Sequence, residues 1–190
     1  MLIGITGRGG TGKSTLAKKI CEHNPDFVYI EVDKLIEQYV FNSSRLLNAV
    51  NSKFSDKEYT INDIVMTYFS YNEKDQQIFK MHLEEIERVL YERIDALGAK
   101  NCVIDWFLLH ELKTFKKMDI KILLTLDRDK RIERVKTRNK GKDIDVFIEV
   151  DNFYRENYNG KFDYIFDTSD ENYTQNIEIL CKKMDNKWRQ

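Results

Sequence analysis

The stretch GITGRGGTGKST, residues 4–15, joins a short apolar run to a segment with helical spacing. It contains the pattern G-x-x-x-x-G-K-[ST], in which glycines let backbone N–H groups point at phosphate oxygens and the following helix offers its positive dipole end. The pattern carries this meaning only between a strand and a helix. Both flanks are present, because residues 2–6 are typical of a buried strand and 13–23 of a helix. The stretch therefore predicts a phosphate-binding loop.

Each part of this loop has an expected task. We expect Lys13 to reach the β and γ phosphates of a nucleotide, Ser14 to ligate Mg²⁺ and Thr15 to donate to the α phosphate. The predicted cofactors are therefore ATP and Mg²⁺. A flexible glycine turn with an ordinary surface lysine is the alternative, and the two flanking elements disfavour it. The residues predicted to bind the nucleotide are Gly7, Gly9, Gly10, Thr11, Gly12, Lys13, Ser14 and Thr15.

The composition fits one α/β domain. The chain has 190 residues, of which 42% are hydrophobic and 33% charged, and this length allows a sizeable core. Its net charge of -1 does not favour a nucleic-acid or membrane partner. We see no apolar run of the roughly 20 residues that span a bilayer, no secretory signal and no disulfide framework. These features predict a cytoplasmic protein, whereas the oligomeric state is left open.

Segments typical of strands alternate with segments typical of helices. A long amphipathic helix is expected from Phe79 to Leu97, ending at Gly98, and further helices follow at 143–157 and from Tyr173. Residues 42–60 show no clear period. This alternation predicts a parallel sheet with right-handed crossovers and helices on both faces. Strands are expected at residues 2–6, 27–33, 101–106, 119–127 and 162–167.

The predicted fold is a three-layer α/β P-loop NTPase fold with a parallel sheet of about five strands and a small helical lid. We expect residues 1–190 to form a single domain. Within it, residues 42–98 are predicted to be a helical region on the acceptor side, and residues 128–157 a lid. Ligands of such sheets bind at the carboxyl ends of the strands, so the chemistry is expected there.

Two aspartates end predicted strands at that rim. Asp33 is our candidate for the base that accepts or orients the proton of an acceptor hydroxyl. The N-cap of the following helix is an alternative role that does not exclude catalysis. Asp105 follows the apolar residues CVI and is the candidate carboxylate that holds Mg²⁺ through water, with a turn-forming aspartate as its alternative.

The segment at 128–142 has eight basic residues and two acidic ones. Most of these charges are expected on the solvated face of a helix. Because Arg131, Arg134 and Arg138 share a helical face, some can lie beside a transferring phosphoryl group when a lid closes. We predict Arg138 and Arg134 for this role. A nucleic-acid surface is disfavoured, since no aromatic stacking motif is interleaved with the basic residues.

Other classes of nucleotide-binding protein fit less well. A GTP switch needs N-K-x-D, but NKGKD places Asp143 one position too far along. A motor-type ATPase usually has a glutamate after the strand-end aspartate to polarise water, whereas this chain has Trp106. What remains is a kinase that positions an acceptor hydroxyl in line with the γ phosphate and excludes water.

The order of these motifs resembles the dephospho-coenzyme A kinase family, which phosphorylates the ribose 3′-hydroxyl of dephospho-coenzyme A. The resemblance covers most of the chain and implies the catalytic base at Asp33 and lid arginines at Arg134 and Arg138. Phe107 and Leu83 depart from the family pattern in acceptor regions, so a nucleoside or nucleotide kinase stays open, as does a regulatory ATP-binding protein without phosphotransfer. The similar stretches are IGITGRGGTGKSTLAKKI at 3–20, VDKL at 32–35, IDWFLLHEL at 104–112, RIERVKTR at 131–138 and FDYIFDTSD at 162–170.

Overall fold

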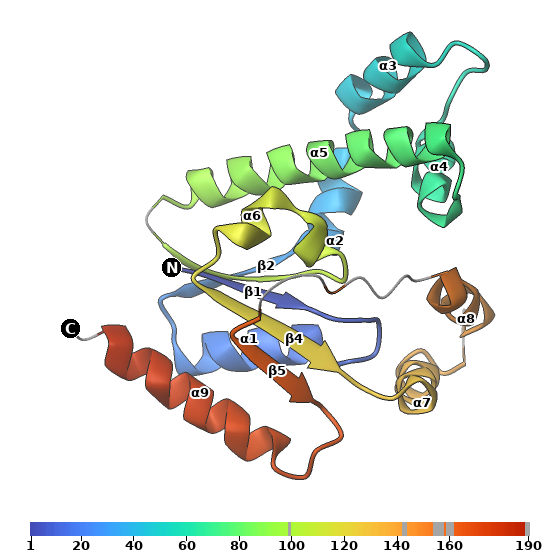
Figure 1. The fold of residues 1–190 in the computed structure, drawn as a ribbon. Coiled ribbons are helices and arrows are strands. Elements are labelled where there is room, and N and C mark those ends of the chain that lie inside the picture. Colours follow the sequence, from blue (N-terminus) through green and yellow to red (C-terminus); the bar gives the residue numbers. More distant parts are fainter. Residues whose placement is uncertain (99, 142–143, 154–157, 159–161, 189–190) are drawn as a thin grey trace. The chain divides into compact units, whose positions relative to one another are not determined.

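The computed structural model describes residues 1–98, 100–141, 144–153, 158 and 162–188. Within these residues a five-stranded parallel sheet has the order β2-β3-β1-β4-β5 (Figure 1). The predicted parallel sheet of about five strands is confirmed. The strands are β1 Leu2–Thr6, β2 Phe27–Glu31, β3 Asn101–Asp105, β4 Ile120–Thr125 and β5 Tyr164–Asp167.

Helices connect the strands and account for most of the remaining described chain. The chain divides into two compact units: a sheet unit of residues 1–31, 99–110 and 115–190, and a helical unit of residues 32–98 and 111–114. The helical segments are α1 Lys13–His23, α2 Val32–Leu35, η1 Ile36–Val40, α3 Ser44–Lys53, α4 Ile61–Met66, η2 Thr67–Phe69, α5 Glu73–Ala96, η3 Leu109–Glu111, α6 Lys113–Lys116, α7 Arg128–Arg138, α8 Ile144–Phe153 and α9 Tyr173–Trp188.

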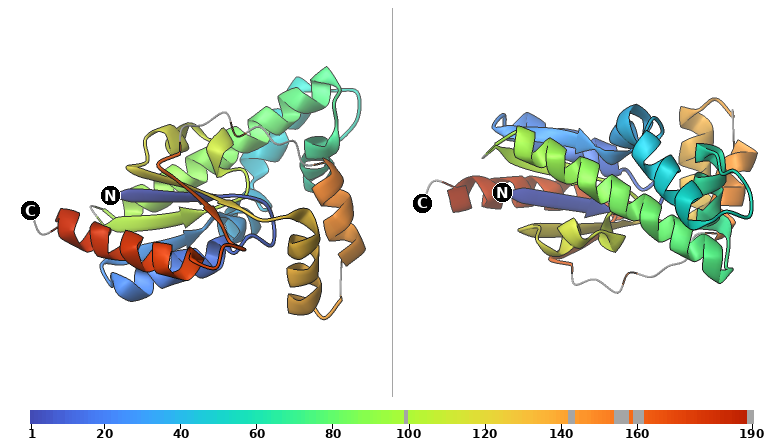
Figure 2. Two further views of the ribbon diagram at one scale, coloured as in Figure 1. Left: turned by 60° about the horizontal axis from the view of Figure 1, so that its bottom comes forward. Right: turned by 90° about the horizontal axis from the view of Figure 1, so that it is seen from above.

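The sheet unit has side chains packed on both faces of its central strand. Ile3 and Ile5 of β1 are fully buried in one cluster with apolar residues of α1 and α9. These two helices lie on the same side of the sheet in Figures 1 and 2. On the other face, a Cβ added at Gly4 would collide with Met118 and approach Phe115. Burial on both faces explains why β1 carries only apolar residues and glycine before Thr6, as is typical of central parallel strands.

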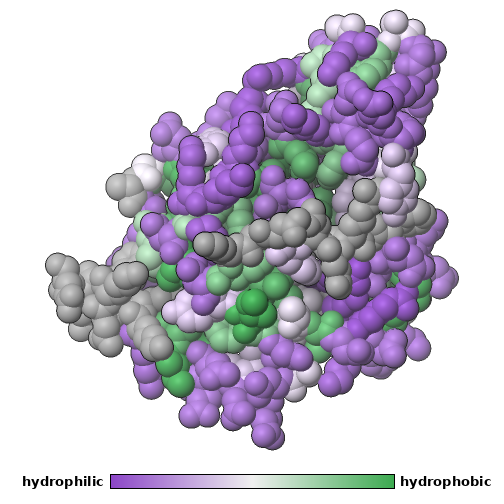
Figure 3. Space-filling model, in the orientation of Figure 1, coloured by the Kyte–Doolittle hydropathy of each residue, from purple (hydrophilic) through white to green (hydrophobic). Residues whose placement is uncertain are grey.

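Strand β5 forms one end of the sheet and is less buried than β1. Its side chains alternate between half-buried and exposed, and Ile165 is 63% exposed. Tyr164 and Phe166 stack on each other on the covered side of the strand. The face of the molecule in Figure 3 is largely hydrophilic, with smaller hydrophobic areas among the charged residues. Asp163 precedes the strand and Asp167 is its last residue, so charges lie at both ends of β5, as is common at sheet edges.

The helical unit is organised around α5. Asn72 caps this helix by accepting a hydrogen bond from the backbone of Asp75, and the buried face of α5 includes Ile78 and Leu90. Ser43 caps α3 and also donates to the buried carboxylate of Glu85 on α5. Polar caps at both helices thus fix their starts, while a side-chain hydrogen bond ties α3 to α5.

Several boundaries differ from the sequence-based expectation, and α5, for example, begins at Glu73 rather than at Phe79. β2 ends at Glu31, because Val32 and Asp33 already belong to α2. Residues 42–60 contain α3, an amphipathic helix whose buried positions Leu46 and Val50 lie four residues apart, so the expectation that this segment has no clear period is wrong. The helix expected at 143–157 is observed as α8, and residues 143 and 154–157 lie outside the described part. Among the described helices, none has the length and apolar character needed to cross a membrane.

Candidate functional site

The loop between β1 and α1 adopts a backbone that requires glycine. Gly7 has φ 142°, and a Cβ there would lie 2.3 Å from the carbonyl oxygen of Leu124. Gly12 precedes α1 in the left-handed region with φ 95°. Residues with a Cβ rarely adopt these positive φ angles. The sharp turn between strand and helix therefore requires glycine at both positions.

Polar contacts within the loop fix its shape. The Thr11 hydroxyl donates to the carbonyl oxygen of Arg8 at 2.8 Å, and the Lys13 ammonium donates to the same oxygen at 3.1 Å. The first turn of α1 carries no acidic residue, and Thr15 there is exposed. The N-terminal end of α1 therefore presents backbone N–H groups and a lysine, which suits an anion such as phosphate.

A buried carboxylate lies beside this helix start. Asp105 ends β3, is 4% exposed and pairs in register with Ile5 of β1. Its Oδ2 accepts a hydrogen bond from the Ser14 hydroxyl at 2.9 Å, and its Oδ1 accepts one from the Tyr29 hydroxyl at 3.0 Å. The structure therefore brings together Ser14 and Asp105, the two residues that the sequence predicted as metal ligands. It adds Tyr29, which no sequence pattern indicated.

The hydroxyls of Ser14 and Tyr29 and the Asp105 carboxylate form a group of oxygen atoms beside the start of α1. Burial raises the pKa of Tyr29, and the negative charge of Asp105 raises it further, against the hydrogen bond of Ser14, which lowers it. Tyr29 is therefore a hydrogen-bond donor at physiological pH. Hydroxyl and carboxylate oxygens are the ligands that Mg²⁺ prefers, so the residues present fit this ion.

The end of β1 is also fixed by the segment that follows β3. The Thr6 hydroxyl donates to the carbonyl oxygen of Phe107 at 3.1 Å and lies 3.2 Å from Nδ1 of His110. Burial lowers the pKa of His110 to about 4, so the ring is neutral near pH 7. His110 thus contacts the end of β1, directly before the loop begins.

Helix α7 contacts the loop through a buried arginine. Arg131 is 1% exposed, and its guanidinium binds the Asp151 carboxylate of α8 with two hydrogen bonds of 2.5 and 3.0 Å. It also donates to the carbonyl oxygens of Leu126 at 3.2 Å and Gly9 at 3.4 Å. Arg131 therefore links α7, α8 and the loop, a role that its position on a basic helix did not indicate.

Two further arginines lie close to the Asp151 carboxylate. Its Oδ2 is 3.6 Å from Nη1 of Arg8 in the loop and 3.3 Å from Nε of Arg128 at the start of α7. Burial alone raises the pKa of Asp151, but the hydrogen bonds and charge of Arg131, with the charges of Arg8 and Arg128, hold it below its usual value. A Cβ added at Gly9 would lie 2.7 Å from the ring of Phe147, so α8 packs directly on the loop.

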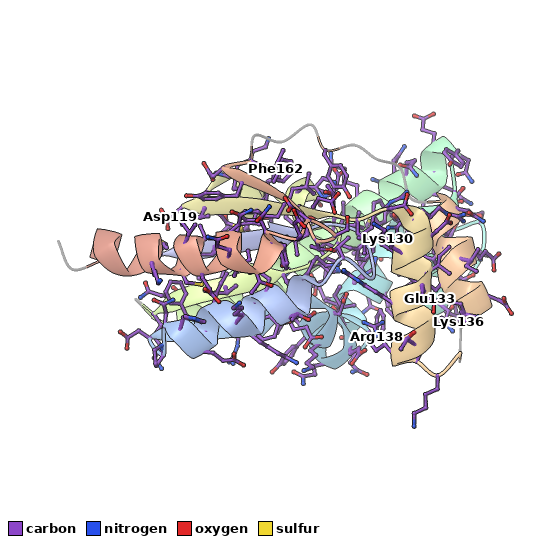
Figure 4. All side chains as sticks on the ribbon, turned by 90° about the horizontal axis from the view of Figure 1, so that it is seen from below. Asp119, Lys130, Glu133, Lys136, Arg138 and Phe162 are labelled. Atoms are coloured by element: carbon purple, nitrogen blue, oxygen red, sulfur yellow. The ribbon has the colours of Figure 1, made fainter. Side chains whose placement is uncertain are left out.

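The two arginines predicted for catalysis make other contacts. Arg134 donates to the hydroxyl of Thr168 at 2.8 Å and to its carbonyl oxygen at 3.0 Å, beyond β5. Arg138 is exposed and donates to the Asn139 side chain at 3.1 Å. Figure 4 shows Arg138 on α7 with Lys130, Glu133 and Lys136 along the same helix. In the described structure, Arg131 rather than Arg134 or Arg138 hydrogen-bonds the loop.

Asp33 belongs to the helical unit. It is the second residue of α2, two positions after the last residue of β2, and its side chain is exposed. An aspartate inside the first turn favours the positive end of a helix, but it is not the N-cap residue that the sequence offered as an alternative. Exposure leaves its carboxylate accessible to solvent and to small molecules.

We expect Asp151→Asn to destabilise the sheet unit by about 3–5 kcal/mol at pH 7, because Arg131 would remain buried without its countercharge. The depressed pKa of Asp151 gives a contribution that is full above the unfolded value of 3.8 and is lost as pH falls through the lower folded value. Urea unfolding of wild type and variant from pH 7 to pH 2.5 measures both effects. The gap between the two proteins should shrink below about pH 4.

Glu149→Gln is the matched control, since Glu149 is exposed on the same helix beyond its first turn. It should change the free energy of unfolding by less than about 0.5 kcal/mol. Two results would contradict a stabilising buried ion pair. One is an equal loss of unfolding free energy in both variants, and the other is a stability difference between wild type and Asp151→Asn that does not depend on pH.

Residues 3–159 match the model of a family described as an AAA domain. This chain belongs to that AAA domain family. The matched span of the AAA domain includes the phosphate loop, Asp105 and both helices of the Arg131–Asp151 pair.

Two curated relatives of this AAA domain are kinases of Clostridium tetani (strain Massachusetts / E88). A uridine kinase is 28% identical over 159 residues, which cover 78% of this chain and 73% of the relative. A dephospho-CoA kinase is 24% identical over 163 residues, covering 78% of this chain and 69% of the relative. The AAA domain is thus related in sequence to kinases that differ in their named substrates.

Solved structures confirm the fold of the AAA domain. TT1252 from Thermus thermophilus superposes with a TM-score of 0.70 at 19% identity, covering 99% of this chain and 97% of that one. Shikimate kinase from Bacteroides thetaiotaomicron gives a TM-score of 0.51 at 16% identity, covering 100% and 99%. The three-layer α/β P-loop fold predicted from the sequence is therefore confirmed.

Proposed function

We propose that this AAA domain is an ATP-dependent small-molecule kinase, which transfers the γ-phosphoryl group of Mg·ATP to a hydroxyl group. The observation that carries the proposal is the Ser14–Asp105 hydrogen bond of 2.9 Å at the start of α1, directly after a glycine loop shaped for phosphate. The two kinases among the curated relatives support the same reaction class.

The residues present fit both proposed cofactors. The backbone from Gly7 to Thr15, with the Lys13 ammonium, would hold the phosphates, and Ser14 and Asp105 would hold Mg²⁺. When bound, Mg·ATP supplies the transferable phosphoryl group, and its metal offsets the charge that develops on the phosphate oxygens.

The chain's own residues then have three tasks. Lys13 and the N–H groups of the loop bind and orient the phosphates. Asp33 accepts or orients the proton of the acceptor hydroxyl, a role that its accessible carboxylate permits. Since Trp106 follows Asp105 where a hydrolytic enzyme usually has a carboxylate, we infer that the acceptor is a substrate hydroxyl rather than water.

We retain residues 128–157 as the proposed lid, of which 142, 143 and 154–157 lie outside the described part. Arg138 is accessible for a closing motion, whereas Arg134 would have to leave Thr168 before it could reach a phosphate. Closure would exclude water and place positive charge beside the transferred group. Residues 42–98 remain the proposed acceptor side.

The acceptor is proposed to be a ribose hydroxyl of a small molecule. Dephospho-coenzyme A is the leading candidate, because the order of motifs resembles its kinase family and one curated relative carries that name. A nucleoside is the second candidate, favoured by the uridine kinase relative. A cytoplasmic location follows from this substrate class and from the composition, and neither a membrane nor a nucleic acid is needed as a partner.

The test is ADP release from Mg·ATP with dephospho-coenzyme A, with uridine and other nucleosides, with nucleoside monophosphates, and without acceptor. Turnover that depends on one of these acceptors supports the proposal and identifies the substrate. Tight ATP binding without turnover on any acceptor would favour a regulatory P-loop protein. Rapid ADP release without acceptor would indicate hydrolysis instead.

A further inference from the structure

We infer that Tyr29 is a positioning residue, which holds the Asp105 carboxylate in the orientation needed for the proposed metal. This inference rests on the proposed Mg·ATP-dependent function. It assigns a role to a strand residue outside the phosphate-loop motif.

The sheet register explains how Tyr29 reaches Asp105. β2 and β3 are parallel neighbours, with Tyr29 opposite Val103 and Glu31 opposite Asp105. Residues two apart on a strand point to the same face, so Asp105 shares the face of Val103 and hence that of Tyr29. The tyrosine ring spans this offset along the strands, and its hydroxyl lies 3.0 Å from Oδ1.

Both carboxylate oxygens of Asp105 are therefore occupied by hydroxyl donors, Ser14 on Oδ2 and Tyr29 on Oδ1. A hydroxyl has one proton to donate and lone pairs to share. Ser14 can thus keep its hydrogen bond to Asp105 while its oxygen serves a cation. Tyr29 donates to the other oxygen, so together the two bonds fix the plane of a carboxylate that is 4% exposed.

Loss of the Tyr29 hydroxyl has a specific consequence. The buried Oδ1 would lose this donor, so the orientation of the carboxylate would be held less firmly than when both hydroxyls donate to it. Groups that orient a metal ligand typically change metal affinity by about 10–100-fold when they are removed. Phosphate binding by the loop backbone and Lys13 does not involve Tyr29, so it should be retained.

The alternative is that Tyr29 only fills space. Its ring packs against the apolar cluster of β1, α1 and α9, and phenylalanine keeps that packing. Tyr29→Phe therefore removes the hydroxyl with little change in volume. The experiment separates the two roles by measuring nucleotide binding with and without the metal.

We would measure the Kd for ATP by calorimetry in excess Mg²⁺ and again in EDTA, for the wild type and Tyr29→Phe. The expected result is a Kd at least about tenfold weaker in Mg²⁺ and unchanged in EDTA, with a matching rise in the Mg²⁺ concentration needed for half-maximal binding. Tyr164→Phe on β5 is the control, and it should change neither value.

Three outcomes overturn the inference. If Tyr29→Phe weakens ATP binding equally in Mg²⁺ and in EDTA, Tyr29 acts only through packing. If the Kd for ATP is unchanged in both, its hydroxyl does not contribute to metal-dependent binding. If the wild type shows no Mg²⁺-dependent binding of ATP, the proposed function fails, and this inference fails with it. An Asp105→Asn background gives independent support if it abolishes the effect of Tyr29→Phe, since the tyrosine is argued to act through that carboxylate.

Discussion

Lys13→Ala is expected to lose phosphotransfer by a factor on the order of 10² or more in kcat/KM, together with a large part of ATP affinity. The Lys13 ammonium crosses the loop to the carbonyl oxygen of Arg8, so it lies over the turn that would receive the phosphates. Alanine removes a positive charge from a site whose ligand carries several negative ones. Steady-state turnover and an ATP titration on the same preparation measure both losses.

Lys18→Ala provides the control for this prediction, because Lys18 is exposed on the same helix. It should leave turnover and ATP affinity near the wild-type values. Both variants should unfold close to the wild-type temperature, since the hydrogen bond from Lys13 to the carbonyl oxygen of Arg8 is worth only roughly 1 kcal/mol. Wild-type turnover in Lys13→Ala would refute the assignment of the loop to phosphate.

The loop and its two flanking elements could be predicted because their signals are local. Glycines at fixed spacing, an apolar run before them and a helical period after them all lie within residues 2–23, and β1 and α1 follow that pattern. The pairing of Ser14 with Asp105 followed from a general rule, since the carboxyl ends of parallel strands share one rim. This long-range proximity could be predicted only because parallel α/β sheets share the same arrangement of strand ends.

The Arg131–Asp151 pair could not be predicted in the same way. In the sequence, Arg131 is one of eight basic residues in a segment that is mostly exposed, and Asp151 is an isolated acid on another helix. Only the packing of α7 and α8 on the loop shows that these two charges are buried together. Charged residues are usually on the surface, so nothing in the pattern marked Arg131 as buried, and the resemblance pointed to Arg134 and Arg138 as lid arginines.

Tyr29 and Asp33 show two further limits of the sequence. A tyrosine in a strand pattern is read as packing, and its hydroxyl becomes significant only when the register places it beside Asp105. The apolar run of β2 was extended to Asp33, although the structure begins α2 at Val32. A strand boundary cannot be read from residues that suit both elements, and this boundary decides whether Asp33 caps the helix or lies in its first turn.

Asp33→Asn is expected to retain ATP binding and to lose on the order of 10² or more in turnover, because a general base contributes about that much. The amide keeps the size of the side chain but cannot accept the proton of the acceptor hydroxyl. The measurement pairs kcat on the acceptor identified by the substrate panel with the Kd for Mg·ATP. A fall in kcat with an unchanged Kd assigns the residue to the chemical step rather than to nucleotide binding.

A structural role for Asp33 would give a different pattern. Its position in the first turn of α2 lets the carboxylate interact with the helix dipole, and asparagine would weaken that interaction. The melting temperature would then fall while kcat per folded molecule stayed at the wild-type value. Glu37→Gln is the matched control, since Glu37 is an exposed acid four residues further along the same unit. If both variants lose turnover equally, the effect is one of general charge, and Asp33 is not the base.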